Sequence, residues 1–417
     1  MHSFAHLSDI HIGAFRQPAL QNLVLKAFDD ALDICVKRGV DFVIVSGDLF
    51  DSNIPDMGLV NSAVRKIREV KDKGIQFYVV YGSHDFSPTQ TSIVDILESA
   101  GLFRKVTEGK EADGKLELEF QIDGRTGTKL CGISGRRRGI ERRYFEILDR
   151  EKLEREEGFK VFIFHGAVTE YKSGQSFEAE SIPLSTLPKS FAYYAGGHIH
   201  EEFVAKEHGY NIAYPGTIFA SDYRDLEKNA GGQKRGFLIA TFAEKLERIE
   251  FVDLPVCDYE MIEYDAGGKN SVRVHNELLE IVNRAKPLGK IVLLRVWGEM
   301  SGGKTADVDF QHLKSILREN GALEVLPNYQ KLTSKEYSQI KVSGEDIRGI
   351  EERLFRENIG TVKVSNMKLK GESGVKLSKE LLTVMREGRN ENEPKNVYEP
   401  RIAQQAIEVL GLKEALG

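Results

Sequence analysis

Residues of the types that bind metal ions follow five apolar segments in the first 200 residues of the chain. Each segment has the composition of a buried β-strand, and each ends in aspartate or histidine. In a parallel α/β sheet the carboxyl ends of the strands meet at one edge, so we expect these side chains to converge on one site. The side chains at the five strand ends are Asp9 and His11, Asp48, His84 and Asp85, His165, and His198 and His200.

The composition of this set indicates the chemistry it would support. Mixed carboxylate and imidazole ligands suit manganese, iron or zinc better than calcium or magnesium. No thiolate contributes, which argues against a structural zinc site. Even without His84 and Asp85, the two carboxylates and four imidazoles of the set are too many for one tetrahedral ion, so the sequence predicts two metals. Two ions about 3.5–4 Å apart can clamp a phosphodiester for in-line attack by hydroxide.

Each element of the pattern also has an ordinary structural explanation. A lone Asp-x-His pair is usually incidental, and a lone buried histidine is usually a core residue. Gly47-Asp48 after a strand is usually a turn. The hypothesis of a metal site rests on the ordered recurrence of such residues at successive strand ends.

Strands and helices alternate in the part of the chain that must position these residues. Helical spacing of apolar residues predicts helices over 18–38 and 56–73, each followed by glycine. Strand–helix–strand alternation predicts βαβ units and a mostly parallel sheet, and a second sheet follows from about residue 105. The strands that carry the motifs are expected at residues 4–9, 41–48, 76–82, 160–166 and 191–200.

The chain of 417 residues is too long for a single core, and its patterns change along its length. Residues 1–253 would form the domain that carries the motifs, and 256–330 a small α+β domain. Residues 331–374 are a linker of uncertain structure. Two amphipathic helices within 375–417 are too short to bury much surface and should dock on a partner.

Composition sets limits on partners and compartment. The 58 basic and 64 acidic residues give a net charge of −6, so any surface that binds nucleic acid must be local. Three distant cysteines form neither a metal spacing nor a disulfide framework, which favours a reducing compartment. The first residues show no signal peptide and no membrane span, and we expect a cytoplasmic protein that makes no membrane contact.

Four motifs, HLSDIHIG, SGDLFD, YYAGGHIH and YPGT followed by GF, resemble the SbcD family of nucleases within the calcineurin-like metallophosphoesterase superfamily. The resemblance covers about residues 1–240 and is more archaeal than bacterial. It implies a four-layer α/β/β/α sandwich with a small α+β capping domain and C-terminal helices. It further implies a manganese-dependent double-strand exonuclease and single-strand endonuclease in double-strand-break repair. The implied partners are DNA ends and single strands, an SbcC or Rad-fifty type of ATPase, and a second copy of the chain.

The resemblance also assigns roles to the motif residues. Two manganese ions would be held by Asp9, His11, Asp48 and His200, and by Asp48, Ser83, His165 and His198, with Asp48 bridging. His84 would orient the phosphate or protonate the departing sugar oxygen, and Asp85 would hydrogen-bond His84 to fix its tautomer. A turn-capping role for Asp85 is the alternative.

Ser83 departs from the family pattern, which has asparagine at this position. A hydroxyl is a shorter and weaker metal ligand than an amide oxygen, so the second metal site and the nuclease activity are expected to be reduced. The departure is natural divergence or an engineered change.

Two further surfaces and two rival functions follow from the same sequence. The arginines of a local cluster would contact DNA phosphates, or they form a solvated helix start: Arg136, Arg137, Arg138, Arg142 and Arg143. The apolar residues Val60, Ile93, Val94 and Leu97 would form a helical dimer interface, or they belong to the core of the domain.

The rival functions are a general metallophosphoesterase and a DNA-tethering scaffold whose site is weakened by Ser83.

Overall fold

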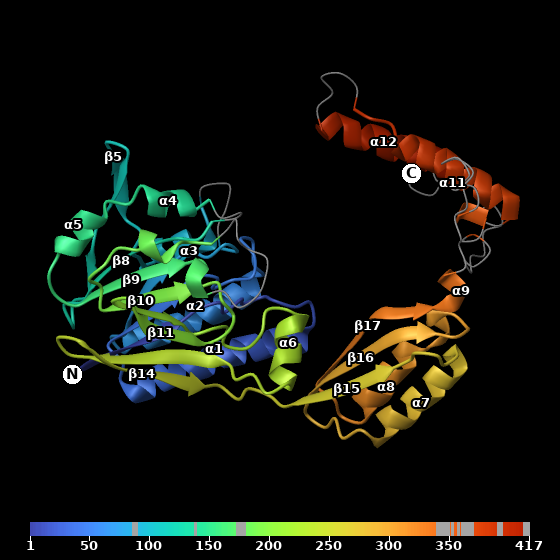
Figure 1. Ribbon diagram of the computed structural model, residues 1–417, viewed down its shortest axis with the longest axis horizontal. Coiled ribbons are helices and arrows are strands. Elements are labelled where there is room, and N and C mark those ends of the chain that lie inside the picture. The colour runs from blue at the N-terminus through green and yellow to red at the C-terminus, as the bar shows by residue number, and fades with distance from the viewer. Residues whose placement is uncertain are drawn as a thin grey trace. The chain divides into compact units, whose positions relative to one another are not determined.

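The computed structural model describes two compact units, Met1–Ser334 and Lys335–Gly417 (Figure 1). The described residues are 1–85, 91–136, 140–171, 181–338, 351, 354–356, 359, 371–389 and 395–411. In this part of the chain, no helix is both long enough and apolar enough to cross a membrane.

The larger unit contains a six-stranded sheet with the strand order β14-β13-β1-β2-β3-β4. The four strands from β1 to β4 are parallel, and β13 and β14 add an antiparallel edge. Their central residues are almost all buried because the sheet is covered on both faces. The strands are β1 (His2–Leu7), β2 (Phe42–Ser46), β3 (Gln76–Val80), β4 (Arg104–Lys105), β13 (Gly236–Phe242) and β14 (Leu246–Asp253).

Three helices cover the outer face of this sheet: α1 (Pro18–Arg38), α2 (Met57–Asp72) and α3 (Ile93–Ser99). Helix α1 begins at Pro18, whose missing N–H needs no partner there, and ends at Gly39 in the left-handed region at φ 65°. The helices predicted over 18–38 and 56–73 are therefore present.

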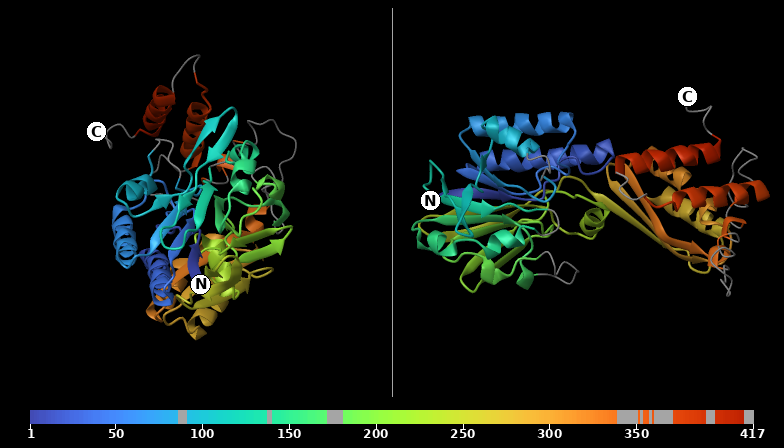
Figure 2. Two further views of the ribbon diagram at one scale, coloured as in Figure 1. Left: turned by 90° about the vertical axis from the view of Figure 1, so that its left-hand side faces the viewer. Right: turned by 90° about the horizontal axis from the view of Figure 1, so that it is seen from above.

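A second six-stranded sheet has the order β11-β12-β10-β9-β8-β7 and packs face to face on the first. Short helices α4 (Arg142–Glu146) and α5 (Arg150–Arg155) cover its other face. The successive layers are visible in the right-hand view of Figure 2, and the predicted α/β/β/α sandwich is confirmed. The strands are β7 (Gln121–Ile122), β8 (Lys129–Ile133), β9 (Lys160–His165), β10 (Tyr193–Gly197), β11 (Phe203–Glu207) and β12 (Tyr210–Tyr214).

Two smaller elements complete this part of the unit. Strands β5 (Gly109–Ala112) and β6 (Lys115–Leu118) form a separate antiparallel hairpin. Helix α6 (Tyr223–Ala230) follows the second sheet and begins after Asp222, whose side chain caps its first turn.

The last part of the larger unit is a small layer of β-strands and helices with its own core. Strands β15, β16 and β17 are all parallel, with α7 and α8 as the crossovers, so the arrangement is α/β rather than the expected α+β. Strand β17 pairs with β16 as far as Ser334, four residues past the expected boundary at 330. The elements are β15 (Tyr259–Asp265), α7 (Ser271–Arg284), β16 (Ile291–Met300), α8 (Phe310–Glu319) and β17 (Glu324–Ser334).

The smaller unit contains α9 (Lys335–Ser338), α11 (Gly371–Met385) and α12 (Lys395–Leu410). Helices α11 and α12 contact each other, and Arg401 forms an ion pair of 2.8 Å with Glu387 between them. Met385 and Val397 are exposed on this hairpin. The linker expected over 331–374 lies mostly outside the described residues.

The residues predicted for a dimer interface belong to the core instead. Val60 on α2 and Val94 and Leu97 on α3 are buried beneath their own helices. Ile93 is partly buried and packs on the same cluster. The prediction was wrong because an apolar helix face looks the same in sequence whether it covers a sheet or a partner.

Candidate metal centre

The predicted metal-binding residues follow strands of both sheets at their carboxyl ends. Asp9 and His11 follow β1, Asp48 follows β2, and the turn that contains Ser83 and His84 follows β3. In the second sheet, His165 ends β9, and His198 and His200 follow β10. Because the two sheets face each other, both edges contribute to one site.

The side chains approach one another closely at this site. Asp48 Oδ2 lies 3.2 Å from His165 Nε2 and 3.8 Å from His11 Nε2. Asp9 Oδ1 lies 4.0 Å from His11 Nε2 and 3.8 Å from His200 Nε2. The side chains form three groups, and within each group the possible ligand atoms all lie within 4.8 Å of one another. The groups are Asp9, His11 and His200; Asp9, Asp48 and His165; and His11, Asp48 and His84.

Two buried nitrogen atoms in this cluster, Nε2 of His11 and Nε2 of His165, face the Asp48 carboxylate but make no hydrogen bond of good geometry. The other nitrogen of each ring is bonded: His11 Nδ1 lies 3.1 Å from Asp51 Oδ1, and His165 Nδ1 lies 2.9 Å from the Ser46 carbonyl oxygen. A buried polar atom without a partner costs free energy, and a metal ion would satisfy both atoms. The residues therefore fit a divalent cation.

Neighbouring groups fix the orientation of the candidate ligands. His200 Nδ1 lies 2.9 Å from Asp225 Oδ2, as is usual for a metal-binding histidine held by a carboxylate. The His198 backbone N–H donates to both oxygens of Asp9, at 3.1 and 3.0 Å. The His84 backbone N–H donates to Asp48 Oδ1 at 2.8 Å. The carboxylates are thus oriented before any ion binds.

The backbone at the site is strained in a way that brings these side chains together. Asp9, His11, Asp48 and His198 have φ values of 50°, 50°, 51° and 89°, in the left-handed region that residues with a Cβ rarely adopt. A Cβ on Gly82 would lie 2.0 Å from Asp48 Oδ1, so only glycine permits the close approach of the two turns.

The charges of the cluster shift the pKa values of its members. Burial alone would lower the pKa of His11, but its hydrogen bond to Asp51 and the charges of Asp48 and Asp9 raise it to about 9. Burial also opposes protonation of His165, but the charge of Asp48 dominates and raises its pKa to about 10. Burial lowers the pKa of His198 to about 4. Without a metal, His11 and His165 therefore carry protons at neutral pH.

Asp85 does not contact His84 as predicted. Its buried carboxylate accepts hydrogen bonds from the backbone N–H groups of Gly82, Leu49 and Phe50 at 3.0–3.3 Å. His84 Nδ1 instead lies 2.7 Å from the carbonyl oxygen of Asp51. The prediction was wrong because Asp85 caps two neighbouring turns, which is the structural alternative stated above.

Three residues that the sequence analysis did not assign support the site: Ser46, Asp51 and Asp225. Asp51 closes the quoted motif SGDLFD, so its position in that motif was the available signal. Asp225 lies 25 residues after His200, and no sequence pattern connects the two. Ser46 acts through its backbone carbonyl, which sequence does not reveal.

The other predicted site residues are placed less tightly. Ser83 is partly buried in the turn between Gly82 and His84. Of the arginine cluster, Arg136 lies over the ring of Tyr144 and Arg142 forms an ion pair with Glu146 on α4. Arg143 is exposed, and Arg137 and Arg138 lie outside the described residues.

Comparison with known proteins places this site in a class. Residues 2–202 match the family model of the calcineurin-like phosphoesterases, so this part of the chain is similar to that family. The fold of that family implies divalent metal ions, in agreement with the three ligand groups described above.

Three of the similar proteins are archaeal and share the name DNA double-strand break repair protein Mre11. The protein from Archaeoglobus fulgidus is 26% identical over 307 residues, which cover 69% of this chain and 67% of that protein. The protein from Sulfurisphaera tokodaii is 27% identical over 69% of this chain and 72% of its own length. That from Methanococcus maripaludis is 28% identical over 57% and 64%, respectively. The resemblance stated from the motifs is therefore confirmed.

The raised pKa values predict that metal binding releases protons. A metal ion needs neutral imidazoles, so at pH 7 binding should displace about two protons, from His11 and His165. The number should fall toward zero as the pH rises through about 9 to 10, and apparent metal affinity should rise with pH up to that range. Calorimetric titration of manganese in buffers of different ionisation enthalpy measures this number.

His11→Asn serves as the control, because it should reduce the release by about one proton per chain. Metal binding without proton release at pH 7 would contradict the account of the charged cluster. Stability of the metal-free domain changes with pH in the opposite direction to metal affinity. These imidazolium groups stabilise the domain fully below pH 6.5, and this contribution is lost as the pH rises through their raised pKa values.

Proposed function

We propose that this chain is a manganese-dependent DNA phosphodiesterase that processes DNA ends in double-strand-break repair. The observation that carries the proposal is the convergence of buried imidazole nitrogens and two carboxylates, in three groups of possible ligand atoms, at the neighbouring edges of the two sheets. The archaeal relatives named as double-strand break repair proteins support DNA as the substrate. Exonuclease activity on duplex ends and endonuclease activity on single strands are part of the proposal.

The site has room in its ligand set for two ions. The mixture of carboxylates and imidazoles favours manganese over magnesium. Two such ions, when bound, would polarise the scissile phosphate and activate the attacking water. The residues proposed to hold them are Asp9, His11, Asp48 and His200 for one ion, and Asp48, Ser83, His165 and His198 for the other.

His84 is proposed as the group that protonates the leaving sugar oxygen. Its side chain is 45% exposed at the edge of the cluster, so substrate can reach it. A hydrogen bond from Nδ1 to the Asp51 carbonyl keeps a proton on that nitrogen and directs Nε2 to substrate. The ring also lies edge-on to His11, with centroids 4.9 Å apart, and belongs to one group of possible ligand atoms. The test must therefore distinguish a His84 that donates a proton from a His84 that binds the metal directly.

The His84→Ala variant tests the proposed function and this role together. On duplex DNA with manganese we expect cleavage to fall by about 10²–10⁴-fold, because a sugar alkoxide needs a proton to leave. On bis-p-nitrophenyl phosphate we expect a much smaller loss, because its leaving group is stable as an anion. Rates on both substrates, with the manganese content of each protein, provide the measurement.

The control is His208→Ala, which removes an exposed imidazole of the same domain. Equal losses on both substrates would exclude His84 as the proton donor, and loss of manganese would make it a ligand. Wild-type protein that cleaves the small substrate but not DNA would favour a general metallophosphoesterase. Wild-type protein that binds DNA and cleaves neither would favour the scaffold.

Ser83 should weaken the ion proposed to be shared with His165 and His198. An asparagine oxygen reaches about one bond further from the backbone than a serine hydroxyl and is a better donor to a divalent ion. Groups that only hydrogen-bond to a metal ligand commonly contribute about 10–100-fold to metal affinity. The loss of a direct ligand should weaken metal binding by at least that factor. Ser83→Asn should therefore lower the manganese concentration for half-maximal cleavage by at least about tenfold.

Manganese titrations of cleavage by the serine and asparagine forms measure this effect. Ser83→Ala is the matched control, and it should behave like the wild type if the hydroxyl contributes little. A serine form that already reaches full activity at low manganese would contradict the assignment, because another group would then replace the amide.

The surfaces proposed to bind DNA and a second copy of the chain change, because several of the residues first assigned to them are buried or contact their own neighbours. The exposed Arg143 is the described member of the arginine cluster most open to phosphate, since Arg136 and Arg142 contact their own neighbours. A homodimer remains proposed, but it would have to use exposed apolar residues of the same helices, such as Met57 and Ile96.

The hairpin of α11 and α12 is proposed to bind the coiled coil of an SbcC-type ATPase. Its exposed Met385 and Val397 leave apolar surface for a partner helix. Removal of residues 371–417 should abolish co-purification with the ATPase, and cleavage of bis-p-nitrophenyl phosphate should stay near the wild-type rate. Co-purification that survives the deletion would contradict this assignment.

A further inference from the structure

A continuous series of hydrogen bonds leads from the candidate ligand His200 to the small layer of β15, β16 and β17. It begins at the imidazole, where His200 Nδ1 lies 2.9 Å from Asp225 Oδ2. The other oxygen of Asp225 lies 3.1 Å from Arg235 Nη2. Arg235 also donates through Nη1 to the backbone carbonyl of His200 itself. Arg235 therefore restrains His200 directly at its backbone carbonyl and indirectly, through Asp225, at its ring.

Arg235 connects the metal centre to a second amide group. Its Nε donates to the side-chain oxygen of Asn229, and all three of Asp225, Asn229 and Arg235 are buried. Asp225 and Asn229 are four residues apart on α6, so they lie on one face of that helix. Arg235 spans this face and uses its planar fork on both neighbours, which a lysine cannot reproduce.

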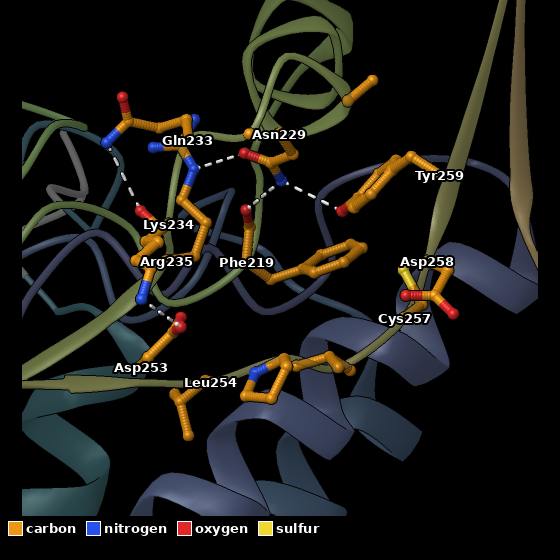
Figure 3. Close-up of a pocket in the computed structure, with 14 residues that line it drawn as sticks. Phe219, Asn229, Gln233, Lys234, Arg235, Asp253, Leu254, Cys257, Asp258 and Tyr259 are labelled. Carbon is orange, nitrogen blue, oxygen red and sulfur yellow. Dashed lines mark hydrogen bonds and ion pairs between the residues drawn. The ribbon is translucent and has the colours of Figure 1, made fainter.

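The series ends on a tyrosine of the small layer. Asn229 Nδ2 donates to the hydroxyl oxygen of Tyr259, at 3.0 Å, and to the carbonyl oxygen of Phe219, at 2.9 Å. Tyr259 is the first residue of β15. Figure 3 shows Asn229 between Arg235 and Tyr259 in the wall of a pocket of about 310 Å³.

We infer that Arg235, Asn229 and Tyr259 are positioning residues for the metal ligand His200, and that Tyr259 connects the small layer to the metal centre through Asn229 and Arg235. The inference rests on the proposed metal centre, because it concerns the orientation of one of its ligands. Asp225 and Arg235 restrict the imidazole and the backbone of His200, and Asn229 restricts Arg235. Tyr259 and the Phe219 carbonyl both accept hydrogen bonds from the Asn229 amide nitrogen and together fix which way that amide faces.

The consequence is that the position of strand β15 affects the metal site without any residue of that strand entering it. A shift of β15 away from α6 would break the hydrogen bond between Tyr259 and Asn229. The nitrogen of the Asn229 amide would then be held by the Phe219 carbonyl alone, and the amide oxygen that directs the fork of Arg235 toward Asp225 would be held less firmly. Ordering of His200 before metal binding would decrease, and so would metal affinity.

The test uses three variants of the full chain and a titration with manganese alone. Asp225→Asn should weaken the manganese site that contains His200 by about 10–100-fold, as outer groups of metal sites commonly do. Tyr259→Phe removes one hydroxyl three residues further out in the series, and a smaller loss of about 3–10-fold is expected. The double variant should lose little more than Asp225→Asn, because both changes act on the same ligand.

Tyr264→Phe is the matched control. Tyr264 lies on the same strand, and its hydroxyl contacts Glu277 and Lys269 within the small layer. Manganese affinity of this variant should equal that of the wild type. Thermal unfolding in chelator separates a metal effect from a general loss of stability, since both tyrosine variants should have similar midpoints.

The outcomes distinguish the two levels of the argument. If the wild type binds manganese no better than His200→Ala, then the proposed metal centre is wrong. If the wild type binds tightly and Tyr259→Phe binds equally well, then the metal centre stands and the positioning series is wrong. Fully additive losses in the double variant would also overturn the series.

Discussion

The two buried carboxylates of Asp9 and Asp48 are the constraint on which the rest of the large domain depends. Both have almost no contact with water, and among the described residues their close cationic partners are imidazoles rather than lysine or arginine. Buried carboxylates persist only where hydrogen bonds and positive charge compensate them. Backbone N–H groups of His198 and His84 supply hydrogen bonds, and protons or metal ions must supply the charge.

This compensation requires the two sheets to keep a fixed position relative to each other, because the ligands come from both. A buried polar network between the sheets serves that purpose. His6 Nδ1 lies 2.9 Å from the Tyr193 hydroxyl and His6 Nε2 lies 2.8 Å from Ser46 Oγ, which also contacts the Gly196 carbonyl at 3.1 Å. Burial lowers the pKa of His6 to about 3, so the ring stays neutral and both nitrogens remain usable. The carbonyl of Ser46 then orients His165.

The alternating strands and helices and the strand-end residues could be predicted from the sequence, because apolar runs and their terminating polar residues are local patterns. The four-layer sandwich was predicted only through the resemblance of the motifs to a known family. The sequence could not provide Asp225, which meets His200 only through tertiary folding. Asp85 was assigned to its sequence neighbour His84, but its carboxylate turns back to cap backbone groups of a different loop. Val94 looked available for a partner because periodicity reports that a helix has an apolar face and not what that face contacts.

Anomalous diffraction at the manganese edge, from crystals grown with manganese, tests the central claim most directly. The account predicts two peaks that share Asp48, one also bounded by Asp9, His11 and His200, and a weaker one bounded by Ser83, His165 and His198. Nε2 of His11 and Nε2 of His165 should each point at a peak. Peaks elsewhere on the chain, or a map without peaks in which these nitrogens face other protein groups, would contradict the account.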